Sequence, residues 1–242
     1  MGQSTTALFY SFIPVATALA GILLVFLKRP SAAVRSAFQH FAAGVVFSVV
    51  AIELLPDIRK QQHPFQVAVG FALGIAIMLI LRFATAKLKK ENDTEQDLPL
   101  PLLVATGLDV LIDGILVGIG LNLGQKQGLL LTIALSTEFL SLGLAIALEL
   151  LERGLNRPKV FSIVLGTCAF VVVGALLGST ILAHVQTGVM QAILSAGLAA
   201  LLYLVTEELL VEAHEVKETP WITASFFLGF IVFLVLGMTE GS

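Results

Sequence analysis

Three acidic residues lie in the middle of long apolar segments, where an ionised carboxylate is costly. Asp109 and Asp113 are four residues apart, so a helix places them on one face, and Glu138 lies near the middle of the next apolar segment. An acid at the centre of a membrane-spanning helix costs about 2.5–3.5 kcal/mol on insertion scales. No Lys or Arg lies at that depth, and two carboxylates one turn apart repel each other unless a cation lies between them. We therefore expect a metal site here, with polar packing between helices as the structural alternative.

Two hydroxyl groups accompany the third acid. Thr137 directly precedes Glu138, and Ser141 follows it by three residues, so both are candidate auxiliary ligands. A site of two Asp, one Glu and two hydroxyls contains only oxygen, which favours hard cations such as Mn²⁺, Mg²⁺, Ca²⁺ or Fe²⁺ over Zn²⁺. No cofactor is expected.

The composition indicates the kind of chain that must position these residues. Of 242 residues, 57% are apolar and only 13% are charged, compared with roughly 25% charged in ordinary soluble domains. A net charge of −3 excludes binding of nucleic acid through charge alone. The single Cys168 excludes a disulfide framework and a cysteine-rich metal site. We expect an all-α, multi-pass integral membrane protein in contact with lipid, and the short chain favours a prokaryotic inner (plasma) membrane.

Eight segments are long and apolar enough to cross a bilayer. They are Ala7–Leu27, Ser36–Ile58, Pro64–Ala86, Leu98–Leu123, Gly128–Leu151, Pro158–Ala183, Gly188–Val211 and Pro220–Gly237. Residues 1–242 are expected to form one transmembrane domain, with a flexible cytoplasmic loop at residues 87–97, which are basic and then acidic. Eleven of the fourteen Lys and Arg residues lie on one side of this arrangement. The positive-inside rule then places both termini outside the cytoplasm.

The second and seventh spans indicate an internal repeat. Segments Glu53–Asp57 and Glu208–Glu212 both have the pattern Glu-Leu-Leu followed by any residue and an acid, 155 positions apart. Matching features follow at offsets of 155 or 156, namely Pro64 with Pro220 and Gly74 with Gly229. Because these spans are an odd number of crossings apart, the copies must run in opposite directions. We expect an inverted repeat in which helices one to three pair with six to eight around a central pair, as in many secondary transporters.

Further acids outline a pathway for a cation toward both membrane surfaces. In the predicted orientation, Glu53 and Asp57 lie near the outer mouth. Glu207, Glu208 and Glu212 lie near the cytoplasmic mouth. The alternative for each of these terminal acids is a solvated helix end. His214, just beyond the seventh span, is a candidate for cytoplasmic capture of the ion, with a plain interfacial loop as the alternative.

At these residues the chain resembles the ZIP (Zrt-/Irt-like protein) family of divalent metal transporters. The resemblance covers nearly the whole chain and is closest in the second and seventh spans. It implies eight spans, extracytoplasmic termini, an inverted 3+2+3 arrangement and transport of the zinc, iron or manganese class into the cytoplasm. A homodimer is compatible with it.

The resemblance diverges at the family's two metal-binding motifs. On the fourth span, Asp113-Gly114 matches the acid-Gly pair, which places Asp109 at the His position and Val110 at the Asn position. On the fifth, Glu138 matches the acid, Thr137 occupies the first His position, Leu140 the Pro position and Ser141 the next ligand position. Both histidines are therefore replaced, so the family name does not imply zinc for this chain.

Two other functions are weighed against transport. A homologue that no longer transports and acts as a metal sensor or partner is motivated by the lost histidines. An intramembrane metalloenzyme would need a His-Glu-X-X-His motif or a nucleophile with its base. No span carries such a pair, so we expect that the chain is not an enzyme.

Overall fold

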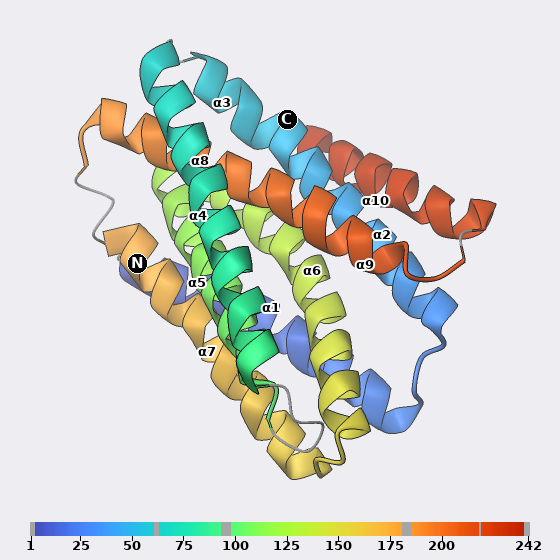
Figure 1. Ribbon diagram of the computed structural model, residues 1–242. Helices are drawn as coiled ribbons and strands as arrows, with labels where there is room; N and C mark the ends of the chain where they lie inside the picture. The colour runs from blue at the N-terminus through green and yellow to red at the C-terminus, as the bar shows by residue number, and fades with distance from the viewer. Residues whose placement is uncertain (1–2, 61–62, 93–97, 181–184, 218, 240–242) are drawn as a thin grey trace.

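The computed structural model describes residues 3–60, 63–92, 98–180, 185–217 and 219–239, and these form helices without a strand. Eight helical stretches are long and apolar enough to cross a membrane. This confirms the all-helical class and the eight predicted membrane-length segments, and it is compatible with a multi-pass membrane protein. The helices run lengthwise beside one another and cross at varied angles (Figure 1).

The described residues form α-helices, labelled α, and two short π-helical turns, labelled η. In chain order they are α1 (Gln3–Leu27), α2 (Ala32–Val49), η1 (Val50–Leu54), α3 (Leu55–Lys60), α4 (Pro64–Asn92), α5 (Leu100–Leu123), α6 (Gln125–Glu152), α7 (Arg157–Thr180), α8 (Thr187–Tyr203), η3 (Leu204–Leu209), α9 (Leu210–Ala213) and α10 (Pro220–Thr239).

The end of α4 differs from the predicted boundary, and two predicted segments include residues that the structure does not describe. Helix α4 continues to Asn92, six residues into the stretch 87–97 that we expected to be a loop. The reason is that Lys, Leu and Glu, which dominate residues 87–91, favour helix. Residues 93–97 of that loop, and residues 181–183 of the predicted sixth span, lie outside the described part of the chain.

The second and seventh spans each contain a π-helical turn that the sequence pattern did not predict. In the second span α2 continues through η1 into α3, and in the seventh α8 continues through η3 into α9. Glu53 lies in η1, whereas Glu207 and Glu208 lie in η3. A π-helical turn inserts a residue into the helix and changes the direction of the side chains that follow, and such turns are frequent at functional sites.

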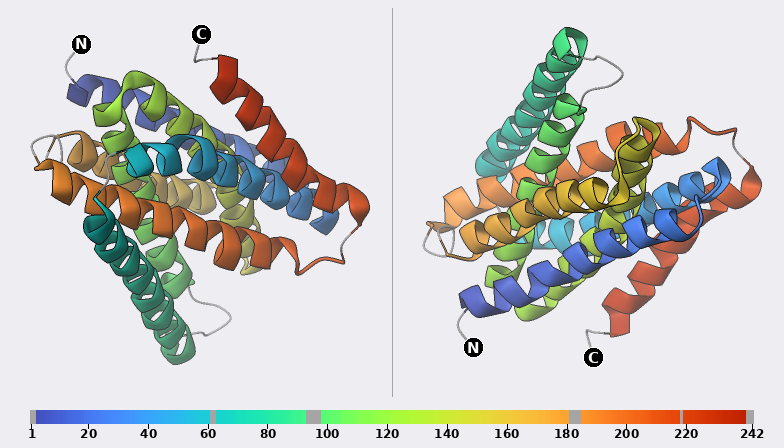
Figure 2. Two further views of the ribbon diagram at one scale, coloured as in Figure 1. Left: turned by 90° about the horizontal axis from the view of Figure 1, so that it is seen from above. Right: turned by 90° about the horizontal axis from the view of Figure 1, so that it is seen from below.

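Four pairs of helices have the most extensive contacts: α5 with α7, α1 with α6, α2 with α10, and α4 with α8. Small residues let these backbones touch. A Cβ atom at Gly74 would meet the backbone of Ala196, and one at Gly229 would meet the backbone of Phe41. Close packing through small residues is typical of membrane helices. Helix α6 is the most enclosed, and α4 projects from one side of the bundle (Figure 2).

An apolar core closes one end of the central helices. Its contributions from α5 and α6 include Leu116, Ile119, Leu130 and Leu131, at the end of α5 and the start of α6. Asp113 therefore lies between this core and the first half of α5.

Candidate metal centre

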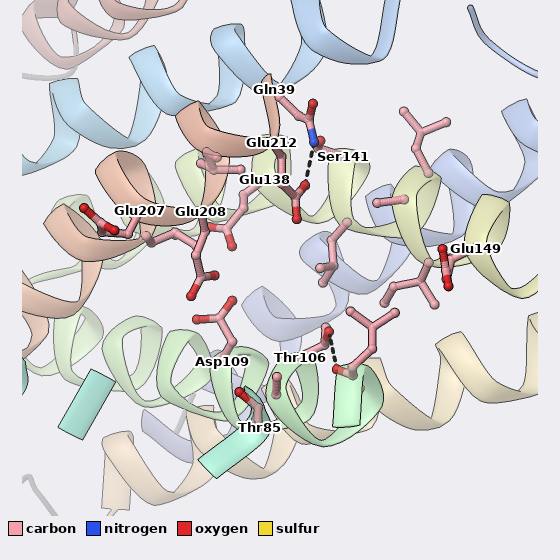
Figure 3. Close-up of a pocket in the computed structure, with 18 of the residues that line it drawn as sticks. Gln39, Thr85, Thr106, Asp109, Glu138, Ser141, Glu149, Glu207, Glu208 and Glu212 are labelled. Atoms are coloured by element: carbon pink, nitrogen blue, oxygen red, sulfur yellow. Dashed lines mark hydrogen bonds between the residues drawn. The ribbon is translucent and has the colours of Figure 1, made fainter. Parts of the chain in front are cut away.

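A cavity of about 440 Å³ opens between the first half of α5 and the second half of α6, away from the apolar core. Its walls come from the first half of α5, the second half of α6, the start of α2, the end of α4 and the segment η3–α9 (Figure 3). Its acidic lining residues are Asp109, Glu138, Glu149, Glu152, Glu207, Glu208, Glu212 and Glu215, against Arg35 and Arg82. The cavity is therefore strongly acidic.

The three predicted central acids converge at the inner end of this cavity. Asp109, Asp113 and Glu138 each offer a carboxylate oxygen, and these oxygens all lie within 4.8 Å of one another. Asp109 lines the cavity, and Asp113 and Glu138 are each only 2% exposed. The three acids come together because α5 places Asp109 and Asp113 one turn apart and α6 packs against α5, and their role as metal ligands stays a prediction.

The buried carboxylates lack the partners that would satisfy them. Asp113 Oδ2 and Glu138 Oε2 are buried without a hydrogen-bond partner. Within the described ranges, no Lys or Arg forms an ion pair with any of the three acids. Polar packing between helices would supply donors to these oxygens, as buried carboxylates require. A cation bound by the three carboxylates fits this geometry better than polar packing does.

The two predicted hydroxyl ligands differ in their placement. Ser141 is buried and lines the cavity, three residues from Glu138 on the same helix face. Thr137 does not line the cavity, and its hydroxyl donates to the Ala134 carbonyl at 2.7 Å. One residue before Glu138, Thr137 is turned about 100° around the helix, so the structure brings only Ser141 to the site.

Neighbouring residues Glu207 and Glu208 make different interactions. Glu207 accepts a hydrogen bond from Arg82 of α4 at 2.7 Å, and Arg82 also donates to the Tyr203 hydroxyl at 3.3 Å. The Glu208 carboxylate instead points toward Asp109 (Figure 3). The sequence predicted only that both lie near one mouth. The π-helical turn η3 contains both residues, and no residue pattern indicated how it would direct them.

Glu212, the last acid of this group, lines the cavity, whereas His214 is absent from the lining. Glu212 lines the mouth and accepts a hydrogen bond from Gln39 Nε2 at 2.6 Å. The His214 ring contacts the His40 ring, with centroids 5.2 Å apart. Neither Gln39 nor His40 lies near another candidate ligand in the chain, so the sequence pattern did not indicate them as site residues.

The acids predicted for the opposite mouth are not part of this cavity. Glu53 and Asp57 are absent from its lining. Asp57 forms an ion pair with Lys60 at 3.0 Å. Glu53 lies close enough to Lys126 for electrostatic attraction, and Lys126 Nζ donates to the Gly237 carbonyl at 3.1 Å. These residues therefore surround a separate polar region, beyond the apolar core.

No protein-family model matches this chain, and no curated protein matches it. The chemistry of the site is therefore the basis on which a function can be proposed.

Proposed function

We propose that this chain is a membrane transporter of divalent metal cations, and that Asp109, Asp113 and Glu138 bind the ion. The observation that supports this most strongly is the convergence of three carboxylates near the middle of two central helices, with no basic partner among the residues that the structure describes. An acidic cavity leads to them from one end, and an apolar core closes the other end. A carrier needs such a site, reachable from one side at a time.

The ligand set favours a hard divalent cation. The three carboxylates and the Ser141 hydroxyl provide oxygen only. Such sites suit Mn²⁺, Mg²⁺, Ca²⁺ or Fe²⁺, whereas the softer ions of the zinc class prefer imidazole or thiolate. Mn²⁺ and Fe²⁺ are common to this chemistry and to the zinc, iron and manganese class that the ZIP-like features imply. Mn²⁺ is the first substrate to test, because Fe²⁺ oxidises readily in air.

The distribution of basic residues gives the proposed orientation. The cavity opens at the same end of the helices as Arg35, Arg82 and Arg153, which belong to the side that carries most of the Lys and Arg residues. By the positive-inside rule this side is cytoplasmic. The proposed state is thus inward-facing, with both termini outside, in a prokaryotic inner membrane. Movement into the cytoplasm is proposed from the resemblance to the ZIP family.

Matching helix contacts support the proposed inverted repeat. Adding 155 to Gly74 and Phe41 gives Gly229 and Ala196, and the observed contacts are Gly74 with Ala196 and Gly229 with Phe41. The contact between α4 and α8 therefore has a counterpart between α10 and α2.

The central helices show a similar correspondence, with an offset of 29 between the glycines of α5 and α6 and of 153 between their contacts on α1 and α7. A Cβ atom at Gly143 of α6 would meet the backbone of Ala18 of α1, and one at Gly114 of α5 would meet the backbone of Val171 of α7. The offset of 29 residues that relates Gly114 to Gly143 also relates Asp109 to Glu138. Two acids of the site thus occupy corresponding positions of the proposed repeat, which suits a site located on its axis.

The two π-helical turns are proposed to be the corresponding gates. Glu208 in η3 and Glu53 in η1 are related by the offset of 155. Glu208 faces Asp109 in this inward-facing arrangement (Figure 3), whereas Glu53 is separated from the site by the apolar core. In the outward-facing state, the repeat would bring Glu53 toward Glu138 as Glu208 lies toward Asp109, with Asp57 near the outer entrance.

Uptake of Mn²⁺ into proteoliposomes tests this proposal. Asp113→Asn and Glu138→Gln keep the size of each side chain and should reduce uptake by about tenfold or more. Glu149→Gln is the matched control on the same helix, because Glu149 lines the cavity but pairs with Arg153 at 2.7 Å. Uptake by the two site variants equal to that of the control would show that the site is wrong. Metal binding without uptake by the parent would favour the sensor alternative.

A further inference from the structure

At the end of the helices opposite the cavity, the Lys126 side chain connects three segments. Lys126 is the second residue of α6, and its Nζ donates to the Gly237 carbonyl in the last turn of α10 at 3.1 Å. A Cβ atom at Gly237 would lie 3.6 Å from Glu53 Oε1, so the Glu53 carboxylate of η1 lies against the same residue. Among the charged neighbours of Glu53, Lys126 exerts the largest electrostatic effect, ahead of Asp57 and Lys60. The ammonium group therefore joins α6 to both α10 and η1.

The surroundings of this ammonium group have the chemistry of a cation site. Carbonyl groups in the last turn of a helix carry a partial negative charge, and Gly237 supplies one of them. The Glu53 carboxylate adds a full charge when it is ionised, and both Glu53 and Lys126 are half-buried. Electrostatic attraction is stronger in such a place than in open water. Lys126 thus acts as a tethered cation where an ion from solution would otherwise be attracted.

The contact with Lys126 keeps Glu53 far from the carboxylate centre. Lys126 and Glu138 are twelve residues apart on α6, which is about 18 Å along a helix. The core between them is apolar and includes Leu130, Leu131 and Ala134. While Glu53 is held beside Lys126, it therefore stays at the outer end of α6 in the proposed orientation.

The proposed repeat explains why the cation at this end comes from α6. The offset of 155 relates Ile52 to Glu207 and Arg82 to Gly237. At the cavity end Arg82 donates to Glu207, whereas at this end a Cβ atom at Gly237 would meet Ile52 Cδ1 at 2.8 Å. Corresponding positions therefore touch at both ends, but one contact is an ion pair and the other is a glycine against an apolar side chain. Lys126 supplies a charge here from a central helix, and it ties that helix to parts that alternating access must move.

We propose that Lys126 is the positioning residue of the outer gate, an inference that rests on the proposed transport function. While the cavity is open at the other end, the Lys126 ammonium holds Glu53 and the end of α10 against α6. A divalent cation that arrives from outside takes the place of the ammonium beside Glu53, and Glu53 is then free to move toward Glu138. Lys126 thus links opening of the outer path to arrival of the ion.

Thiol labelling of the full-length protein in detergent tests this gate. Ala134→Cys places a thiol one turn from Glu138 toward Lys126, at a position that is 1% exposed and absent from the cavity lining. Lys126→Gln removes the charge, and it should raise the rate at which a charged methanethiosulfonate reagent modifies this thiol by about tenfold or more. Lys126→Arg keeps the charge and should preserve the slow rate. Lys60→Gln is the matched control, because Lys60 lies at the same end and pairs with Asp57 at 3.0 Å.

The buried Cys168 distinguishes opening of the gate from a general loss of packing, because it lies fully buried in a separate apolar cluster. Faster modification at position 134, with Cys168 still protected, supports the gate. Modification of both thiols shows that Lys126 only stabilises the fold, and a rate equal to that of Lys60→Gln shows that it closes nothing; either result overturns the proposal. If Lys126→Gln fails to fold, Glu53→Gln breaks the same contact and must give the same increase.

Mn²⁺ uptake separates this proposal from the transport function. Lys126→Gln should lower the KM for external Mn²⁺ by about threefold or more, because the outward-open state is more populated without the tethered competitor. Lys126→Arg should keep the KM of the parent. An unchanged KM in Lys126→Gln, with uptake intact, overturns the gate and leaves the carboxylate centre standing. If the parent takes up no Mn²⁺, the transport function fails, and the labelling, which needs no metal, still decides whether Lys126 closes this end.

Discussion

Asp113 of α5 and Glu138 of α6 each bury a carboxylate oxygen that has no hydrogen-bond partner, while oxygens of both side chains lie within 4.8 Å of one another. Two neighbouring buried carboxylates destabilise a fold when both are ionised, because each repels the other and neither is solvated. Their presence therefore indicates that function, rather than stability, explains these residues.

The site variants should be more stable than the parent without metal. Asp113→Asn and Glu138→Gln each remove a charge from the cluster, so repulsion falls. A gain of 1 kcal/mol would raise the melting temperature by about 2–4 °C in a chain of this size. Added Mn²⁺ should stabilise the parent and not the variants. Thermal unfolding in detergent, with and without Mn²⁺, measures both effects, and stabilisation of both variants by Mn²⁺ equal to that of the parent would contradict the site.

Glu207 and Glu208 should differ in their effect on transport although they are adjacent. Glu208 points toward Asp109, so Glu208→Gln should lower Mn²⁺ uptake by about tenfold. Glu207 pairs with Arg82, and both side chains are about half exposed. Such a pair contributes about 0–1 kcal/mol to stability, so Glu207→Gln should leave uptake within about twofold. Equal loss in both variants would show that η3 directs these side chains differently from the structure.

Glycines at corresponding helix contacts should have corresponding effects on stability. A Cβ atom at Gly74 would lie 2.8 Å from the Ala196 Cα, and one at Gly229 would lie 3.0 Å from the Phe41 carbonyl carbon. Gly74→Ala and Gly229→Ala should each destabilise by about 1–3 kcal/mol, because backbone must move to admit the methyl group. At Gly166 of α7 a Cβ would meet nothing within 4 Å, so Gly166→Ala is the control and should be neutral or stabilising. A neutral Gly229→Ala beside a destabilising Gly74→Ala would count against the repeat.

Cysteine labelling tests the proposed orientation. Cys168 is fully buried, so the parent should not react with a membrane-impermeant maleimide. Thr85→Cys, at the cavity mouth, should react only from the cytoplasmic side. Lys60 lies at the opposite end of the helices, and its side chain is 74% exposed. The variant Lys60→Cys should therefore react only from outside. The reverse pattern would place the cavity and the termini on the other sides of the membrane.

Much of the architecture could be predicted because apolar segment length and helical spacing are local properties. The eight spans and the common face of Asp109 and Asp113 follow from counting residues. The proximity of Glu138 to Asp109 and Asp113 required only that two consecutive spans pack together, which short connections favour.

The remaining features depend on contacts between distant segments. The π-helical turn η3 separates Glu207, which turns to Arg82, from Glu208, which turns to Asp109. Residues 204–209 carry no pattern that distinguishes this turn from α-helix. His40 and His214 are 174 positions apart, so their contact follows from the packing of α2 against α9 and not from spacing in the chain. Thr137 could have been excluded, because a residue adjacent to Glu138 cannot share its helix face.

Anomalous X-ray diffraction from crystals of the protein soaked in MnCl₂ is the most direct test of the carboxylate centre. We expect an anomalous peak between Asp109, Asp113 and Glu138, with carboxylate oxygens at distances that suit a bound cation. We expect no peak at this position in the Asp113→Asn protein. A saturating soak that leaves the three carboxylates without a metal, while Mn²⁺ occupies other positions in the same crystal, would contradict it.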